Sequence, residues 1–179
     1  MYTKQSASGV LVPSLSPRVL LQCALVLMSL SGVVAKYRPI LVTGLLQLFY
    51  MDCAGINAFL RQVNAKWPST CPKKVVSWMQ LMQDLLEQCQ PLTCGGCREG
   101  VALLLRRFMK VATDSHVDCA LQALSVLNSA RVMSCFILPY PEQMKGIEKC
   151  LNLCSRHWSE GVREKAEIVF DVLLDYLGS

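Results

Sequence analysis

The stretch from Asp114 to Arg131 constrains the fold more than any other part of the sequence, because it has the spacing of an amphipathic helix. Its apolar residues recur at intervals of three and four, which places them on one face of a helix. They are Val117, Ala120, Leu121, Leu124 and Leu127. Asp114 or Ser115 is placed to cap the first turn. A helix of this length is stable mainly when it packs between others, so we expect the rest of the chain to supply them.

Further helical patterns follow one another along the chain, separated by short loops. Two prolines in three residues break the chain at Leu138–Pro141, and Pro72 suits a first helical position. No segment alternates with a period of two residues, so the chain is predicted to be all-α, without strands. The other predicted helices cover residues 19–35, 40–49, 56–63, 75–86, 101–111, 142–154 and 160–177.

Three of these helices share a motif in which an alanine precedes a run of leucines or other aliphatic residues. Ala24 and Ala120 lie 96 residues apart, and Ala120 and Ala166 lie 46 residues apart. These intervals are about two units and one unit of the helical repeats that are 40–47 residues long. The Ala-x-x-x-Leu cadence resembles the inner helices of armadillo and HEAT repeats over residues 18–177. The resemblance implies stacked antiparallel helix pairs that form a short armadillo/HEAT-like α-solenoid.

The composition fits such a solenoid, because one repeat cannot bury its own apolar face and must share a core with its neighbours. Of the 179 residues, 53% are hydrophobic and only 17% are charged, which excludes disorder over most of the length. Residues 18–177 are predicted to form a single repeat domain, preceded by a mobile leader at residues 1–17. The first helix lacks a polar outer face, so we expect this domain to be part of a longer solenoid.

Residues 18–35 also admit a different interpretation. Arg18 precedes seventeen uncharged residues, and Val33-Val34-Ala35 satisfies the small-residue rule for signal cleavage. A membrane anchor is the third reading, although a helix of this length spans only about 25 Å. Cleavage would leave an odd number of cysteines, so we favour a helix buried on all sides. A secreted or membrane-associated small helical protein, with a signal segment at 18–35, is the alternative.

Cysteine usage indicates a reducing environment. Most of the ten cysteines lie inside apolar or helical patterns, where free cysteine behaves as a small hydrophobic residue. We therefore expect an intracellular protein of the cytoplasm or nucleus, with the secretory pathway as the alternative.

Cys94-x-x-Cys97 is the sharpest local motif, and its functional readings are a redox pair or half of a zinc site. Cys150 with Cys154, or Cys154 with His157, would be the other half. Gly95-Gly96 between the two cysteines suits a plain turn instead. We therefore expect neither metal-binding residues nor a redox site.

Nothing else in the sequence predicts chemistry. His116 precedes Cys119 by three residues and His157 follows Cys154 by three, but neither pair has an evident third group to orient a dyad. No glycine-rich phosphate loop is present. The sequence therefore predicts no catalytic residues, no cofactor and no small-molecule substrate, so the protein is not expected to be an enzyme.

Arg98, Arg106, Arg107 and Lys110 fall on one predicted helix and are the candidate partner-binding residues. They would form a basic ridge for an acidic partner or for phosphates, and a solvated helix face is the alternative reading. The net charge of +5 is spread too thinly to predict nucleic-acid binding, and a membrane partner is not expected either. The resemblance implies a non-catalytic protein–protein interaction scaffold or adaptor. Its partner would lie as a helix or extended peptide in the solenoid groove, near residues 117–127.

Overall fold

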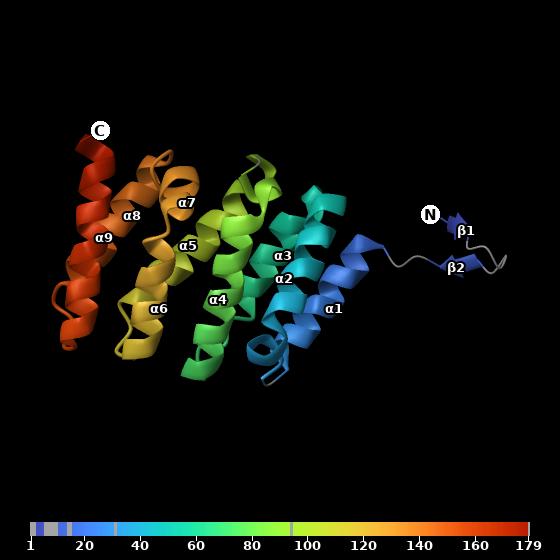
Figure 1. Ribbon diagram of the computed structural model, residues 1–179, viewed down its shortest axis with the longest axis horizontal. Coiled ribbons are helices and arrows are strands. Elements are labelled where there is room, and N and C mark those ends of the chain that lie inside the picture. The colour runs from blue at the N-terminus through green and yellow to red at the C-terminus, as the bar shows by residue number, and fades with distance from the viewer. Residues whose placement is uncertain (1–2, 6–10, 14–15, 31, 94, 179) are drawn as a thin grey trace.

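The computed structural model of the chain describes residues 3–5, 11–13, 16–30, 32–93 and 95–178. Over these residues the protein is an elongated row of packed helices, with a small strand pair at its N-terminal end (Figure 1). The α-helices are α1 (Pro17–Ser29), α2 (Val33–Met51), α3 (Cys53–Ala65), α4 (Pro72–Gln88), α5 (Arg98–Ala112), α6 (Val117–Leu127), α7 (Ala130–Val132), α8 (Pro141–Cys154) and α9 (Glu160–Gly178). Two 3-10 turns, η1 (Gln90–Thr93) and η2 (Gly95–Cys97), precede α5, and a π-helical turn, η3 (Met133–Ile137), follows α7.

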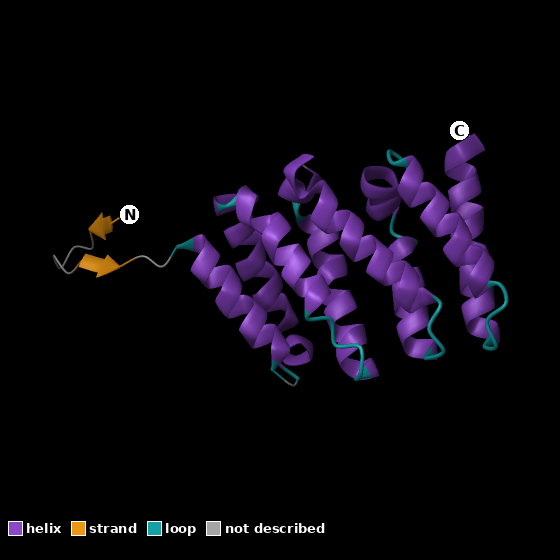
Figure 2. Cartoon of the chain, turned by 180° about the vertical axis from the view of Figure 1, so that it is seen from behind, coloured by secondary structure: helices purple, strands orange, loops and turns teal. Residues whose placement is uncertain are grey.

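The helices form two layers, which confirms the predicted solenoid of stacked pairs. In one layer α1, α3, α5 and α8 pack in succession, and in the other α2, α4, α6 and α9 do so. Within pairs, α1 packs on α2, α5 on α6 and α8 on α9. Figure 2 shows the same row from behind.

The repeat length appears directly in the hydrogen bonds between neighbouring pairs. Arg38 bonds Gln80 at a separation of 42 residues, Arg107 bonds Asn64 at 43, and His157 contacts Asp114 at 43. Equivalent positions in successive pairs therefore lie about one predicted repeat apart. The three alanines of the motif, at 24, 120 and 166, are all buried, which confirms that they occupy core positions.

Large side chains of α4 and of the loop before it form the centre of the core. Trp78 is 1% exposed, and Trp67 packs edge-on against it with ring centroids 5.9 Å apart. Trp67 also meets the ring of Phe108 from α5 at 5.9 Å. Such edge-to-face contacts favour one arrangement of the repeats over others, because aromatic pairs have preferred geometries.

The prediction of one helix over residues 19–35 that is buried on all sides is wrong. α1 ends at Ser29 and α2 begins at Val33, with a turn at Gly32, whose φ of 74° favours glycine. α1 buries one face only, and Val26 on the other face is 57% exposed. The reason is its place at the end of the row, where neighbouring helices cover only one of its sides.

No single described helix has both the length and the apolar character needed to cross a membrane. The pair Val117–Leu127 and Ala130–Ile137, bent by 60° at the break between them, meets both requirements only when taken together, and only by length and composition.

Two short strands differ from the expectation that the chain has none. β1 (Thr3–Gln5) and β2 (Leu11–Pro13) pair antiparallel, with Lys4 opposite Val12. Strands of three residues are too short to produce an alternating pattern that sequence inspection can recognise. Apart from these strands and residues 16–17, the predicted mobile leader at 1–17 lies outside the described residues.

The predicted helix start at Pro72 is confirmed, whereas the predicted cap at Asp114 or Ser115 is wrong. The Asp52 carboxylate accepts a hydrogen bond from the Gly55 N–H at 3.0 Å and caps α3, and Pro72 opens α4. Neither Asp114 nor Ser115 caps α6, whose N-cap is His116. Their main-chain oxygens instead contact the next repeat, Asp114 at His157 Nε2 and Ser115 at the Trp158 indole. The loop is therefore shaped by contacts with the next repeat.

Candidate functional site

The four predicted basic residues do not form one ridge, because α5 turns them to different sides. Arg98 and Arg106 line one pocket of about 460 Å³, whereas Arg107 and Lys110 line another of about 330 Å³ beside Trp67. Nine residues at about 100° per residue place Arg107 opposite Arg98 on a helix. Only Arg98 and Arg106 therefore belong to one candidate site.

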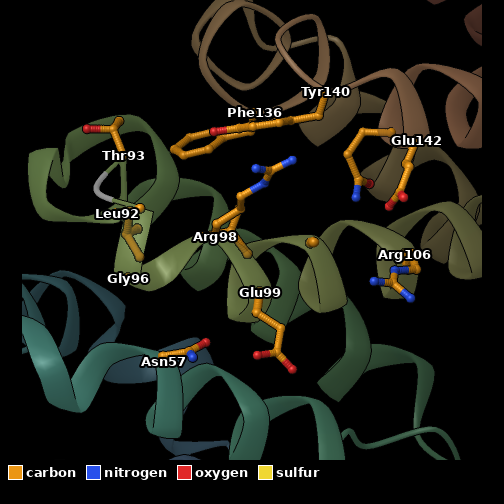
Figure 3. A pocket seen from close by; sticks show the side chains of 14 residues that line it. Asn57, Leu92, Thr93, Gly96, Arg98, Glu99, Arg106, Phe136, Tyr140 and Glu142 are labelled. Carbon is orange, nitrogen blue, oxygen red and sulfur yellow. The ribbon is translucent and has the colours of Figure 1, made fainter.

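We call this site the α5–α8 pocket (Figure 3). It lies in the layer of α3, α5 and α8, and the turns before α5 and α8 close its ends. Its functional lining consists of Asn57 from α3, Leu92 and Thr93 from η1, Arg98, Glu99, Val101 and Arg106 from α5, Phe136 from η3, and Tyr140, Glu142 and Gln143 at the start of α8.

Arg98 is held in place by an aromatic ring. Its guanidinium carbon lies 4.2 Å from the centroid of the Tyr140 ring, and Figure 3 shows the side chain pointing toward Tyr140 and Phe136. A cation over an aromatic face is attracted by the ring quadrupole, while its N–H donors remain free. Within the described ranges, neither Arg98 nor Arg106 makes an ion pair. The pocket therefore contains two arginine side chains that are available to a ligand.

Two carboxylates share the pocket with these arginines. Glu99 is paired with Arg61 of α3, so its charge is already compensated. Glu142 stands in the first turn of α8, where the helix dipole favours a negative charge. A ligand in the pocket meets positive and negative groups together, and strong negative charge on the ligand is opposed mainly by Glu142.

Gln143 is the residue that the sequence analysis missed. It is 6% exposed, it lines the pocket, and it is the only buried polar or charged residue in the part of the chain that is described. No hydrogen bond joins its side-chain amide to another described residue, and the amide is not among the fully buried polar groups without a partner, so it opens onto the pocket. Its place after Pro141 marks a helix start in the sequence, but nothing there indicates that the amide is buried.

Asn57 has a side-chain oxygen that is buried and has no described partner. A Cβ built on Gly100 would lie 2.7 Å from Asn57 Oδ1, so the amide oxygen packs against the bare glycine. Gln143 is therefore the amide that the pocket offers.

Arg107 is used inside the chain. Its Nε donates to Asn64 Oδ1 at 3.0 Å and its Nη2 donates to the Asn64 main-chain oxygen at 3.2 Å. Asn64 lies in the last turn of α3, so Arg107 pairs a carbonyl at the end of that helix. Lys110 remains exposed near the end of α5.

A second hollow of about 870 Å³ lies between α4 and α6, in the other layer, and we call it the α4–α6 groove. It is lined by Cys71, Pro72, Lys73, Val76, His116, Asp118, Leu121, Gln122 and Ser125. α6, the helix whose apolar spacing most constrains the fold, thus contributes Leu121, Gln122 and Ser125 to this groove. Leu124 is fully buried and belongs to the core, not to this surface.

Side-chain amides connect three helices next to this groove. Gln80 accepts from Arg38 at 2.7 Å and donates to Gln122 at 3.4 Å, and Gln122 donates to Gln83 at 3.0 Å. Asp84 pairs with Arg38 at 3.2 Å. Burial raises the pKa of the Asp84 carboxyl, although the Arg38 guanidinium opposes this shift. Polar groups therefore follow the axis of the repeats from α2 through α4 to α6.

Two of the described cysteines fasten neighbouring helices together. Cys94 lies outside the described residues, so the expectation of a plain turn at Cys94-x-x-Cys97 stays a prediction, while Cys97 is buried in η2. Cys150 and Cys154 donate to the Met109 and Ala112 carbonyls at 3.3 Å, which fastens α8 to α5. No group of three or more potential metal-binding side chains occurs among the residues that the structure describes.

The chain was also compared with known proteins. The family model for the protein phosphatase 2A regulatory B subunit (B56 family) matches residues 12–177. The matched span begins in β2 and ends in α9, so it includes every helix described above. A comparison with curated proteins returns no match.

Proposed function

Because the chain belongs to the B56 family of protein phosphatase 2A regulatory B subunits, we propose that it is a module through which protein phosphatase 2A engages other proteins. The family is regulatory and non-catalytic, which confirms the predicted interaction scaffold and the expectation that the protein is not an enzyme. Its fold is an armadillo/HEAT-like helical repeat, as the resemblance implied, and no observation supports the secreted alternative.

In this proposal a helix or an extended peptide of a protein partner lies in the α4–α6 groove. Val76 and Leu121 offer it apolar contacts in the floor of the hollow. The amide of Gln122, which lines the groove, carries both a donor and an acceptor group, and these match the alternating N–H and C=O groups of an extended chain. The row of amides beside the hollow supports an extended peptide in particular.

The basic residues would bind acidic groups of a protein partner. Arg98 and Arg106 support this role because their charges have no carboxylate partner in the described part of the chain. Lys110 is exposed beside the second pocket. Arg107 would contribute only its remaining donors, since two of its nitrogens already bond Asn64.

We also propose that residues 18–177 form one domain within a longer solenoid, in the cytoplasm or nucleus. Apolar side chains on both terminal helices support this, among them Val26 at 57% and Ile168 at 50% exposure. Neighbouring repeats would cover them, as stacked repeats do. Cys23, Cys53, Cys71, Cys119, Cys135, Cys150 and Cys154 are free thiols, as expected in a reducing compartment.

Co-sedimentation with purified protein phosphatase 2A that lacks a B subunit tests the function. We expect the chain to sediment with the phosphatase, and Ser125→Arg, which fills the α4–α6 groove, to weaken this at least about tenfold. Ser134→Arg makes the same change at an exposed position outside the groove and should bind normally. Circular dichroism checks that both variants keep their helices.

The outcomes separate the two parts of the proposal. Absence of co-sedimentation by the unaltered chain contradicts the phosphatase-binding function. Equal binding by both arginine variants leaves that function standing and removes the groove as the binding surface.

A further inference from the structure

We propose that the α5–α8 pocket binds a single carboxylate side chain, from a glutamate or aspartate of a partner peptide, through Arg98 and Gln143. This inference rests on the proposed protein-binding function and specifies the chemistry that one of its surfaces recognises. It is carried by three features of the pocket: a fixed arginine, an unbonded amide that opens onto the pocket, and a balance of charge that limits the ligand to one negative charge.

The fixed arginine supplies the charge and the direction. The Tyr140 ring lies 4.2 Å from the guanidinium carbon of Arg98 and holds it over the pocket in the absence of a carboxylate. A guanidinium offers five N–H donors in a plane, a geometry that suits the two oxygens of a carboxylate. Because the ring already restrains this side chain, less conformational entropy is lost when a ligand binds.

The buried amide supplies a second donor. The Gln143 N–H donates to the Tyr140 carbonyl at 2.9 Å, which places Gln143 in the first turn of α8, next to the residue that holds Arg98. Its side chain is 94% removed from solvent, yet it lines the pocket without a hydrogen-bond partner in the described part of the chain. A ligand oxygen can accept a hydrogen bond from this amide without breaking one inside the chain.

The carboxylates of the pocket select a singly charged ligand. Glu142 and Glu99 both line it, and only Glu99 has a described counter-charge, in Arg61. A phosphate carries a charge between −1.5 and −2 at pH 7, so it would be repelled by Glu142 more strongly than a carboxylate would. The charge balance therefore favours an acidic side chain over a phosphorylated one.

The remaining wall suits the aliphatic part of such a side chain. Phe136 and Leu92 are buried residues whose surfaces line the pocket, together with Val101 of α5. A volume of about 460 Å³ lies in the usual range for binding pockets and leaves room for the flanking main chain. The ligand is therefore a peptide segment that presents an acid, and not a free ion.

The test uses the smallest peptide probe that carries the acid. Acetyl-glutamate methylamide is titrated into the ¹⁵N-labelled chain while the Gln143 side-chain amide signals are followed by NMR. Acetyl-glutamine methylamide, which is nearly isosteric but uncharged, and acetyl-phosphoserine methylamide are titrated in parallel. We expect saturable shifts of the Gln143 signals with the glutamate probe and at least about tenfold weaker binding of the other two.

Variants assign the effect to the two residues. Arg98→Gln should weaken binding of the glutamate probe about tenfold, and Gln143→Leu, which keeps an apolar side chain of similar size, should weaken it several-fold. Arg156→Gln makes the same charge change at an exposed residue after α8, outside the pocket, and should bind within about twofold of the unaltered chain. Urea unfolding verifies that each variant is folded.

The inference is overturned if the Gln143 signals do not shift, if glutamine binds as well as glutamate, or if Arg98→Gln equals Arg156→Gln. Tighter binding of phosphoserine would assign the pocket to phosphate and overturn the carboxylate. None of these results affects co-sedimentation with the phosphatase. Loss of co-sedimentation with intact glutamate binding would instead remove the proposed function and leave the pocket's chemistry in place.

Discussion

The indole Nε1 of Trp78 donates a hydrogen bond to the main-chain oxygen of Met28 across 3.1 Å and so joins α4 to the end of α1. Both residues are almost fully buried. The Met28 oxygen is one of the last carbonyls of α1, which have no partner within their own helix. The helix end of one repeat is therefore completed by a side chain of the next.

Trp78→Phe removes this donor and keeps an aromatic ring in the core. We expect it to lower the free energy of unfolding by about 2–3 kcal/mol, because the Met28 oxygen stays buried without a partner and some volume is lost. Urea unfolding followed by circular dichroism measures this. Trp158→Phe, at a residue that is 71% exposed, should lower it by less than about 1 kcal/mol. Equal effects of the two changes would mean that the buried hydrogen bond does not stabilise the fold.

Two neighbouring arginines of α5 should differ in their effect on stability, because only Arg107 bonds the end of another helix. Arg107→Gln loses the two hydrogen bonds to Asn64 at the end of α3, so we expect the free energy of unfolding to fall by about 1–2 kcal/mol. Arg106→Gln makes the same change at an exposed residue without a described partner and should stay within about 0.5 kcal/mol. The pair is compared by thermal and urea unfolding. A larger loss at position 106 than at 107 would contradict the capping role.

The helices and the repeat length could be predicted from the sequence because both depend on local spacing. The apolar stripe of α6 and the buried alanines at 24, 120 and 166 repeat at intervals that any helical stack must obey. The break at Gly32 escaped prediction because seventeen uncharged residues look like one helix, and only the turn conformation separates α1 from α2.

The candidate pocket could be predicted only in part. Arg98 and Arg106 are conspicuous as basic residues, but Tyr140 and Gln143 come from the next repeat and become their neighbours only through stacking. The separation of Arg107 from Arg98 could have been predicted, since helical geometry alone places the two side chains on opposite sides of α5. That Gln143 is almost wholly buried while its amide opens onto the pocket is a property of packing, and no local pattern reveals it.

Close packing of α3 on α5 predicts the effect of a single methyl group. A Cβ at Gly100 would lie 2.7 Å from Asn57 Oδ1 and 2.9 Å from Leu60 Cβ, so Gly100→Ala forces the two helices apart. We expect a loss of about 1–3 kcal/mol in the free energy of unfolding. Gly161→Ala in α9 meets no atom within 4 Å and should be neutral or stabilise by up to about 1 kcal/mol, because alanine is the better helix former. If Gly100→Ala is as stable as Gly161→Ala, the contact between α3 and α5 is not as close as described.

Cysteine reactivity tests the packing of α8 on α5 without any substitution. Cys23, Cys53 and Cys71 are exposed, whereas Cys150 donates to the Met109 carbonyl and is buried. The hydrogen bond with Cys154 and burial raise the pKa of the Cys150 thiol, so the reactive thiolate is suppressed there even at alkaline pH.

We expect iodoacetamide at pH 8 to modify the three exposed cysteines of the folded protein much faster than Cys150, and mass spectrometry of the digested chain resolves the sites. In urea the difference should disappear, because unfolding restores ordinary thiol pKa values and access together. Raising the pH from 7 to 8.5 should leave Cys150 slow, because its pKa is raised. Fast modification of Cys150 in the folded chain would show that α8 separates readily from α5, and a pocket built between these two helices would then lack the fixed geometry that a specific ligand requires.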